Sequence, residues 1–245
     1  MTSTSRPDQH RPIVLVPGYW LGAWAWDEVV ELLNTAGSRA VGLTLPGLDP
    51  EDTQSTTRTL DDQADAISAI LDEMGGDAVL VGHSGANGPV SLVVDRHPEL
   101  VHRIVWVDSG PMSDGGAFAP DLPEETAELP LPDFDTLGKQ ASLEGLSNEH
   151  LDRFRARAVP EPAQVARARV ALSNSARHDV LTTLICCSIP SVQVLELAAA
   201  GNPMFSAVAH LTNFTAMDLP TGHWPMWSRP QELAEAIREA ATSTS

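Results

Sequence analysis

Ser84 lies in a segment whose residue types suit a nucleophile. It stands in the sequence GHSGA, residues 82–86, between a short apolar run at 78–81 and an expected helix at 86–96. A serine that attacks a carbonyl must stand clear of the sheet on a sharp turn, and small residues two positions to either side let strand and helix approach each other. A glycine-rich phosphate-binding loop would require Lys and Ser/Thr directly after its glycines, and none follows here. The segment therefore predicts a nucleophilic serine.

His223 is the histidine best placed to act as the base. A serine hydroxyl needs an imidazole within hydrogen-bond reach to take its proton. Of eight histidines, His223 alone follows an expected strand, 214–219, through a Thr-Gly turn and precedes the last expected helix, 230–241. This places it at the carboxyl edge of the sheet, where open α/β sheets collect their sites. By itself it would be an ordinary loop residue, and its pairing with Ser84 favours catalysis. His83 is expected to point elsewhere.

Alternating strands and helices must position these two residues. Short links between them predict an α/β fold with a mostly parallel six-stranded sheet and helices on both faces. The alternation breaks at 112–178, where many prolines and two helical stretches, around 147–158 and 163–172, predict a helical lid insertion. The predicted organisation is a flexible N-terminal segment (1–11), an α/β core (12–111 and 179–242) and a lid or cap (112–178). The expected strands lie at 13–16, 40–45, 78–81, 103–107, 182–188 and 214–219.

Four segments resemble the α/β-hydrolase superfamily, in particular the compact esterase branch that includes plant methylesterases and hydroxynitrile lyases. They are VLVPGYWLGAWAW near the start, the LPG turn, VLVGHSGANG around the serine and TGHWPM near the end. They span most of residues 13–241 and leave the predicted lid unmatched. The resemblance implies the α/β-hydrolase fold and the chain order serine, acid, histidine. Ala86 departs from the usual G-x-S-x-G pattern, but it is small enough to keep the turn possible.

The position of the acid that orients the histidine differs from that in the plant branch, where the acid usually follows the strand after the lid. Here that strand, 182–188, is followed by no carboxylate, and Glu196 comes later in a segment with helical spacing. Some members of the superfamily carry the acid directly after the strand that follows the nucleophile's helix. Asp108 occupies that position, at the same sheet edge as the serine and the histidine. Asp108 is therefore the predicted acid, with a turn or cap role and Glu196 left as alternatives. Asp218 is too close to the histidine in sequence to reach around its ring.

Backbone N–H groups are predicted to form the oxyanion hole. One belongs to Gly85, the residue after the serine, and the resemblance supplies Tyr19 as the second donor. Trp20, Met112 and Trp224 adjoin these site residues in sequence and are predicted to line an apolar substrate pocket. Each of the three, taken alone, is more often a core residue.

The charge of the chain argues against polyanionic partners. Asp and Glu number 33 against 15 Lys and Arg, a net charge of −18, which repels nucleic acid and anionic membrane surfaces. No run approaches the ~20 apolar residues of a membrane span, and the first residues carry no signal region. The adjacent Cys186 and Cys187 are expected to be reduced, so the predicted location is cytoplasmic. No metal or cofactor is predicted, and the oligomeric state stays open.

These residues together predict a serine esterase that cleaves a carboxylic ester or lactone with an apolar group through an acyl-enzyme. A cofactor-independent lyase or dioxygenase on the same Ser-His-Asp frame is an alternative. Hydroxynitrile lyases carry a lysine directly after the histidine, where this chain has Trp224, whereas ring-cleaving dioxygenases resemble it in the position of the acid. A small-molecule binding protein without hydrolytic activity is the third hypothesis.

Overall fold

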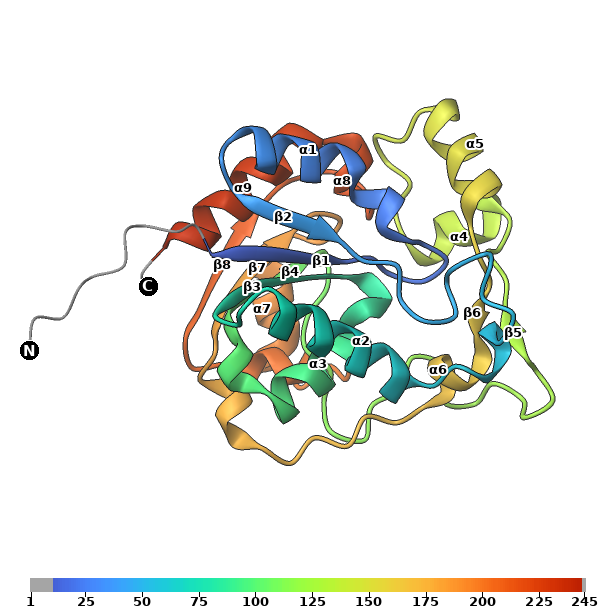
Figure 1. The fold of residues 1–245 in the computed structure, drawn as a ribbon, viewed down its shortest axis with the longest axis horizontal. Helices are drawn as coiled ribbons and strands as arrows, with labels where there is room; N and C mark the ends of the chain where they lie inside the picture. Colours follow the sequence, from blue (N-terminus) through green and yellow to red (C-terminus); the bar gives the residue numbers. More distant parts are fainter. Residues whose placement is uncertain (1–10, 244–245) are drawn as a thin grey trace, which may run out of the picture.

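Six parallel strands form the central sheet of the protein (Figure 1). The structure, a computed structural model, describes residues 11–243. The strand order is β2-β1-β3-β4-β7-β8, and every neighbouring pair is parallel. The prediction of a six-stranded α/β sheet is therefore confirmed. The strands are β1 (Pro12–Val16), β2 (Arg39–Gly42), β3 (Ala78–His83), β4 (Val101–Val107), β7 (Leu181–Cys186) and β8 (Phe214–Asp218).

Helices cover both faces of this sheet, as expected for a buried parallel sheet. Alternate side chains of β1 point to opposite faces, so Ile13 and Leu15 belong to one hydrophobic cluster and Val14 and Val16 to the other. In Figure 1, α1 and α9 lie on one face and α2, α3 and α7 on the other. These helices are α1 (Asp27–Thr35), α2 (Leu60–Glu73), α3 (Asn87–Arg96), α7 (Ser191–Ala199) and α9 (Pro230–Thr242).

Several single-turn helices connect these elements. Thr59 caps α2 because its hydroxyl oxygen accepts a hydrogen bond from the Asp62 backbone N–H, and the Asp62 carboxylate accepts one from the Thr59 backbone N–H. The short helices are η1 (Ala23–Trp26), η2 (Ser55–Thr57), η3 (Ser84–Ala86), η4 (Pro98–Leu100), η5 (Ser175–His178), η6 (Ser206–His210) and α8 (Pro225–Ser228).

Between β4 and β7 the chain forms an insertion, most of which lies at the right of Figure 1. The helix expected at 147–158 is present as α5. The helical stretch expected at 163–172 is wrong beyond Arg167. There the Val170 N–H donates to the Gly116 carbonyl oxygen (2.8 Å) and the Val170 side chain is buried, so the chain runs extended across the core. A two-stranded sheet was not predicted. The insertion contains β5 (Glu128–Leu129), α4 (Phe134–Gln140), α5 (Asn148–Arg157), β6 (Glu161–Pro162) and α6 (Ala163–Arg167).

Other predictions meet the structure only in part. Residues 1–10 of the predicted flexible segment lie outside the described residues. Cys186 and Cys187 are buried and free of any disulfide. Among residues 11–243, no helix combines the length and the apolar character needed to cross a bilayer. The same residues contain no cluster of three or more His, Cys, Asp or Glu side chains suited to a metal ion.

Candidate active site

A strained turn holds Ser84 at the carboxyl end of β3. The backbone of Ser84 has φ = 52°, in the left-handed region that residues with a Cβ rarely adopt. Small neighbours make room for the turn. A Cβ on Gly18 would lie 2.7 Å from the Ser84 Cβ, and one on Gly82 would lie 3.0 Å from the Trp106 ring. Gly82, two residues before the serine, therefore leaves room for the indole of the adjacent strand β4.

The structure brings Ser84, His223 and Asp108 into one hydrogen-bonded chain. The His223 Nε2 atom lies 2.8 Å from the Ser84 Oγ atom, and its Nδ1 atom lies 2.6 Å from Oδ2 of Asp108. The three residues come from the ends of β3 and β4 and from the loop after β8. Because all three strands are parallel, their carboxyl ends meet at one sheet edge.

Asp108 receives donors from the neighbouring strand as well as from His223. Its Oδ1 accepts the backbone N–H groups of Cys187 (3.0 Å) and Ser188 (2.8 Å), and its Oδ2 accepts the Ser188 hydroxyl (2.6 Å). Burial would raise the pKa of Asp108, but the contacts with His223 and Ser188 outweigh it and lower the pKa to about 2. Asp108 is therefore a carboxylate at neutral pH. Sequence reasoning missed Ser188, which the adjacency of β4 and β7 brings to this position.

His83, which was expected to point elsewhere, lies against the base His223. Its Nε2 atom lies 2.8 Å from the backbone carbonyl oxygen of His223, and the two ring centroids are 4.9 Å apart. Burial, together with the nearby His223, lowers the pKa of His83 to about 3. A neutral imidazole therefore donates to the His223 carbonyl and supports that loop from beneath. The two histidines lie 140 residues apart in the chain, so no local pattern indicates the contact.

The other carboxylates considered from the sequence lie elsewhere. Asp218 accepts the backbone N–H (2.6 Å) and the hydroxyl (3.0 Å) of Ser191, the first residue of α7. Glu196 is exposed on the same helix. Neither is bonded to His223, whose Nδ1 faces Asp108.

The loop after β1, residues 17–22 (the first loop), packs over the Ser84 turn. A Cβ on Gly85 would lie 2.5 Å from the Tyr19 ring, so these two predicted oxyanion donors are neighbours. Adjacent strands explain the contact, because β1 pairs with β3 and Val16 is in register with Gly82. Tyr19 is 8% exposed, and burial raises the pKa of its hydroxyl well above the usual value.

Trp20 is held in this loop by the insertion. Its φ of 67° is unusual for a bulky residue, a strain of about 1–3 kcal/mol that persists only where surrounding contacts impose it. The Trp20 indole N–H donates to the Leu129 carbonyl oxygen (2.9 Å), and the Trp20 carbonyl oxygen accepts the Val159 N–H (3.1 Å). Both contacts come from the β5–β6 region.

The predicted pocket residues separate into two groups. Trp224 is buried, with its ring edge-on to the His223 ring at 4.9 Å between centroids and close to Phe154. Trp20 adjoins Tyr19. Met112, by contrast, lines a separate cavity of about 220 Å³ together with residues such as Trp106. Among the described residues that line this cavity, none belongs to the Ser84–His223–Asp108 chain. The structure thus places Trp224 against His223, Trp20 beside Tyr19 and Met112 on another cavity.

The model of the alpha/beta hydrolase family matches residues 13–236. The protein therefore belongs to this family. The resemblance to plant methylesterases is also confirmed. Putative methylesterase 14 (chloroplastic) of Arabidopsis thaliana is 31% identical over 109 residues, which are 43% of this chain and 31% of the relative. Methylesterase 3 of the same plant is 24% identical over 265 residues, covering 97% of this chain and 98% of the relative.

A solved structure confirms the fold over almost the whole chain. It is an extracellular alpha/beta-hydrolase from a Paenibacillus species, described as sharing structural and functional homology with tobacco salicylic acid binding protein 2. The two superpose with a TM-score of 0.76 at 20% identity, over 95% of this chain and 100% of that one.

Proposed function

We propose that this protein is a serine esterase that cleaves a carboxylic ester or lactone bearing an apolar group. The observation that carries the proposal is the continuous hydrogen-bond chain from the Ser84 hydroxyl through both nitrogens of His223 to the Asp108 carboxylate. That arrangement suits nucleophilic catalysis, since the imidazole can take the hydroxyl proton while the carboxylate fixes its tautomer.

In the first half-reaction the Ser84 Oγ attacks the ester carbonyl carbon while its proton moves to Nε2 of His223. The imidazolium is stabilised by Asp108, whose low pKa keeps it ionised throughout. The backbone N–H groups of Gly85 and Tyr19 are the proposed donors to the developing oxyanion. Collapse of the tetrahedral intermediate breaks the bond to the leaving oxygen, which takes the proton from His223 and departs as an alcohol.

In the second half-reaction water hydrolyses the acyl-enzyme. His223 removes a proton from the water as its oxygen attacks the acyl carbon. The second tetrahedral intermediate releases the carboxylic acid product, and Ser84 Oγ regains its proton from His223. A lactone would follow the same steps and yield a single hydroxy acid.

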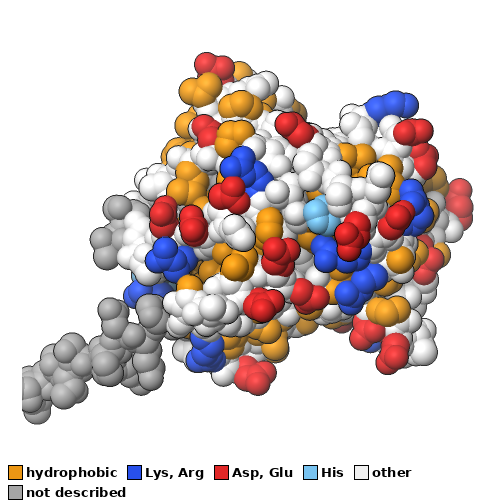
Figure 2. All heavy atoms as spheres, turned by 90° about the horizontal axis from the view of Figure 1, so that it is seen from above, with side chains coloured by type: hydrophobic (Ala, Val, Ile, Leu, Met, Phe, Trp, Pro, Cys, Tyr) orange, Lys and Arg blue, Asp and Glu red, His pale blue; other side chains and the backbone are white. Residues whose placement is uncertain are grey.

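Apolar residues around the base favour an apolar group on the substrate. The buried Trp224 contacts both His223 and Phe154. The names of the curated relatives, methylesterases, agree with ester hydrolysis. A small-molecule substrate also suits the surface, since acidic, basic and apolar side chains are interspersed on the face in Figure 2 and the net charge is −18. The free thiols of Cys186 and Cys187 agree with a cytoplasmic location, which is part of the proposal.

Labelling and turnover together test this proposal. The wild type and Ser84→Ala would be treated with a fluorophosphonate probe and assayed with p-nitrophenyl esters of increasing acyl length. The expected result is rapid labelling at Ser84, turnover by the wild type and loss of both in Ser84→Ala. Ser68→Ala is the matched control, because the Ser68 hydroxyl only bonds the Ala64 carbonyl oxygen within α2. Labelling without turnover of any ester would contradict the esterase and favour a lyase, a dioxygenase or a binding protein.

A further inference from the structure

Contacts from the insertion converge on Trp20, next to the proposed oxyanion donor Tyr19. Leu129 of β5 accepts the indole N–H, Val159 donates to the backbone carbonyl oxygen, and the Glu161 carboxyl group of β6 faces the Trp20 backbone N–H. The side chain and the carbonyl of one strained residue are therefore hydrogen-bonded to one short stretch of chain, and its amide faces a carboxyl group of the same stretch. Leu129 and Glu161 are direct partners in the β5–β6 register, so one small sheet positions these contacts.

Glu161 is unusual among these contacts because it is a fully buried acid. Its exposed fraction is 0%, and its Oε1 accepts a hydrogen bond from the Gln63 side-chain amide (3.1 Å). Within residues 11–243, its Oε2 has no hydrogen-bond partner. Burial raises the pKa of Glu161 to about 8, against smaller opposing effects of Gln63 and the Trp20 N–H. The carboxyl group is therefore mostly neutral at pH 7.

Gln63 connects this acid to the hydrolase core. Its side-chain amide, at the start of α2, donates both to Glu161 and to the carbonyl oxygen of Pro46 (3.2 Å). The loop that begins at Pro46 packs closely against β6. A Cβ on Gly47 would lie 2.5 Å from Pro162, the neighbour of Glu161 in β6. The acid thus lies where α2, this loop and the first loop meet.

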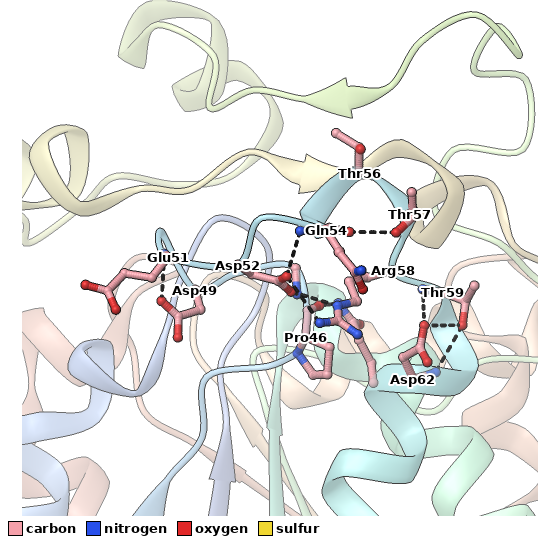
Figure 3. A network of polar contacts seen from close by, with 12 residues as sticks. Pro46, Asp49, Glu51, Asp52, Gln54, Thr56, Thr57, Arg58, Thr59 and Asp62 are labelled. Carbon is pink, nitrogen blue, oxygen red and sulfur yellow. Dashed lines mark hydrogen bonds and ion pairs between the residues drawn. The ribbon is translucent and has the colours of Figure 1, made fainter.

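The charged groups around Glu161 would not compensate its negative charge if it ionised. In the loop at 46–59, Asp52 and Arg58 are paired with each other (2.7 Å), beneath the strands of the insertion in Figure 3. Glu128 of β5 is exposed. Tyr19 is the titratable group that interacts with Glu161, and its own hydroxyl stays neutral. No cation is therefore available among these groups to stabilise an ionised Glu161.

We propose that Glu161 is a positioning residue that fixes the Tyr19–Trp20 peptide and thereby aims the Tyr19 N–H at the oxyanion. The proposal rests on the function proposed above. The Trp20 N–H and the Tyr19 carbonyl belong to the same peptide plane. A rotation of that plane therefore turns the backbone of Tyr19 and with it the Tyr19 N–H. A negative charge on Glu161 would be attracted to the Trp20 N–H and would favour access of water to the buried group. Either change moves the first loop.

Two substitutions at one position separate this role from simple packing. Glu161→Gln keeps the acceptor for Gln63 and cannot ionise, whereas Glu161→Ala removes the contact. Glu128→Gln is the control, since it neutralises an exposed carboxylate of the same small sheet. For each full-length protein, kcat, KM and the rate of Ser84 labelling by a fluorophosphonate would be measured from about pH 6 to pH 9.5, with thermal melting and with Ser84→Ala as the background.

The expected pattern is a difference in pH profile. Wild-type kcat and labelling rate should fall about tenfold per pH unit above pH 8, where Glu161 ionises, and Glu161→Gln should keep its neutral-pH rate across that range. Glu161→Ala should lose about 10²-fold or more in kcat with little change in KM, as for a lost oxyanion donor. Glu128→Gln should follow the wild type.

The same decline in wild type and Glu161→Gln would overturn the proposal, whether or not Glu161→Ala folds. So would a folded Glu161→Ala with the wild-type kcat. If the wild type hydrolyses no ester, the esterase fails separately, and the labelling rates still test Glu161 because the probe's phosphoryl oxygen occupies the same hole. Absence of any labelling at Ser84 would overturn both proposals.

Discussion

Asp108 of the core and Glu161 of the insertion are both buried carboxyl groups, yet their pKa values move in opposite directions, to about 2 and about 8. Burial raises the pKa of each. The difference lies in the donors, because Asp108 accepts two backbone N–H groups, a hydroxyl and an imidazole, whereas Glu161 has one hydrogen bond, from Gln63. Enough donors keep a buried carboxyl group charged, and too few leave it neutral.

Topology decides which of the two regions supplies donors. Asp108 follows β4 directly, so it faces the backbone of the chain as it leaves the neighbouring strand β7. Any parallel sheet edge presents free N–H groups in this way. Glu161 faces instead α2 and the first loop, and the Gln63 side chain supplies its one hydrogen bond. The core therefore holds a charged carboxylate next to the proposed base, and the insertion holds a neutral carboxyl group next to the first loop.

The largest expected effect tests the charged member of the pair. Asp108→Asn should lower kcat for a p-nitrophenyl ester by roughly 10⁴-fold, since the amide presents the wrong hydrogen-bond pattern to His223. Steady-state kinetics at pH 7 would measure it. The folded state should survive, because an amide oxygen can still accept the N–H groups of Cys187 and Ser188.

Asp218→Asn is the matched control for that variant. Asp218 is also a carboxylate at the end of a strand, but its partner is Ser191 at the start of α7. It should leave kcat within about twofold, as for substitutions away from the site. Equal losses in the two variants would mean that the sheet edge as a whole, rather than the contact with His223, depends on negative charge.

The second effect concerns the neutral member of the pair. The pKa of Glu161 is about 8 in the folded protein, and its ordinary value is 4.5. Between pH 4.5 and pH 8 the unfolded chain therefore binds fewer protons than the folded protein. Wild-type stability should therefore fall as pH rises through this window, by about 3 kcal/mol from pH 5 to pH 7.5, and level off above pH 8. Glu161→Gln should lack this slope. Urea unfolding at both pH values would measure it, and parallel slopes in the two proteins would refute the neutral carboxyl group.

The sequence carried enough information to predict the core and the Ser84–His223–Asp108 chain. Each of the three follows a strand, and parallel strands with short links have only one way to meet, with their carboxyl ends at one edge. The glycines beside Ser84 and His223 mark turns at the strand ends. Local signals therefore sufficed although His223 lies 115 residues from Asp108 and 139 residues from Ser84.

The insertion could not be predicted in the same way. Its strands are two residues long. The helix α6 ends at Arg167, and the chain that follows runs along the core and buries the side chain of Val170. Glu161 was not singled out, since nothing around an acid next to prolines indicates complete burial. Trp20 was expected to line a pocket, and its contacts with Leu129 and Val159 depend on tertiary packing alone.

A third, smaller effect tests how much the Ser188 hydroxyl, one of the donors to Asp108, contributes to the unfolding free energy. Ser188→Ala removes the hydroxyl at 2.6 Å and leaves the backbone N–H groups in place. Hydrogen bonds to charged groups contribute about 1.5–3 kcal/mol, so the unfolding free energy at pH 7 should fall by about 1–2 kcal/mol. Ser191→Ala, which removes the hydroxyl bonded to the exposed carboxylate Asp218, is the control and should cost less. Equal losses, measured by urea unfolding, would mean that burial adds nothing to the bond at Asp108.

The smallest expected effect belongs to Glu196, the other acid that the sequence left open. It is exposed on α7 while Asp108 occupies Nδ1 of His223, so a charge there is screened by solvent and contributes little to the imidazolium. Glu196→Gln should keep kcat within about twofold of the wild type at pH 7. A loss of tenfold or more in steady-state kinetics, with Asp108→Asn near normal, would transfer the orienting role to α7. It would then follow that the hydrogen bond between Asp108 and His223 serves stability alone.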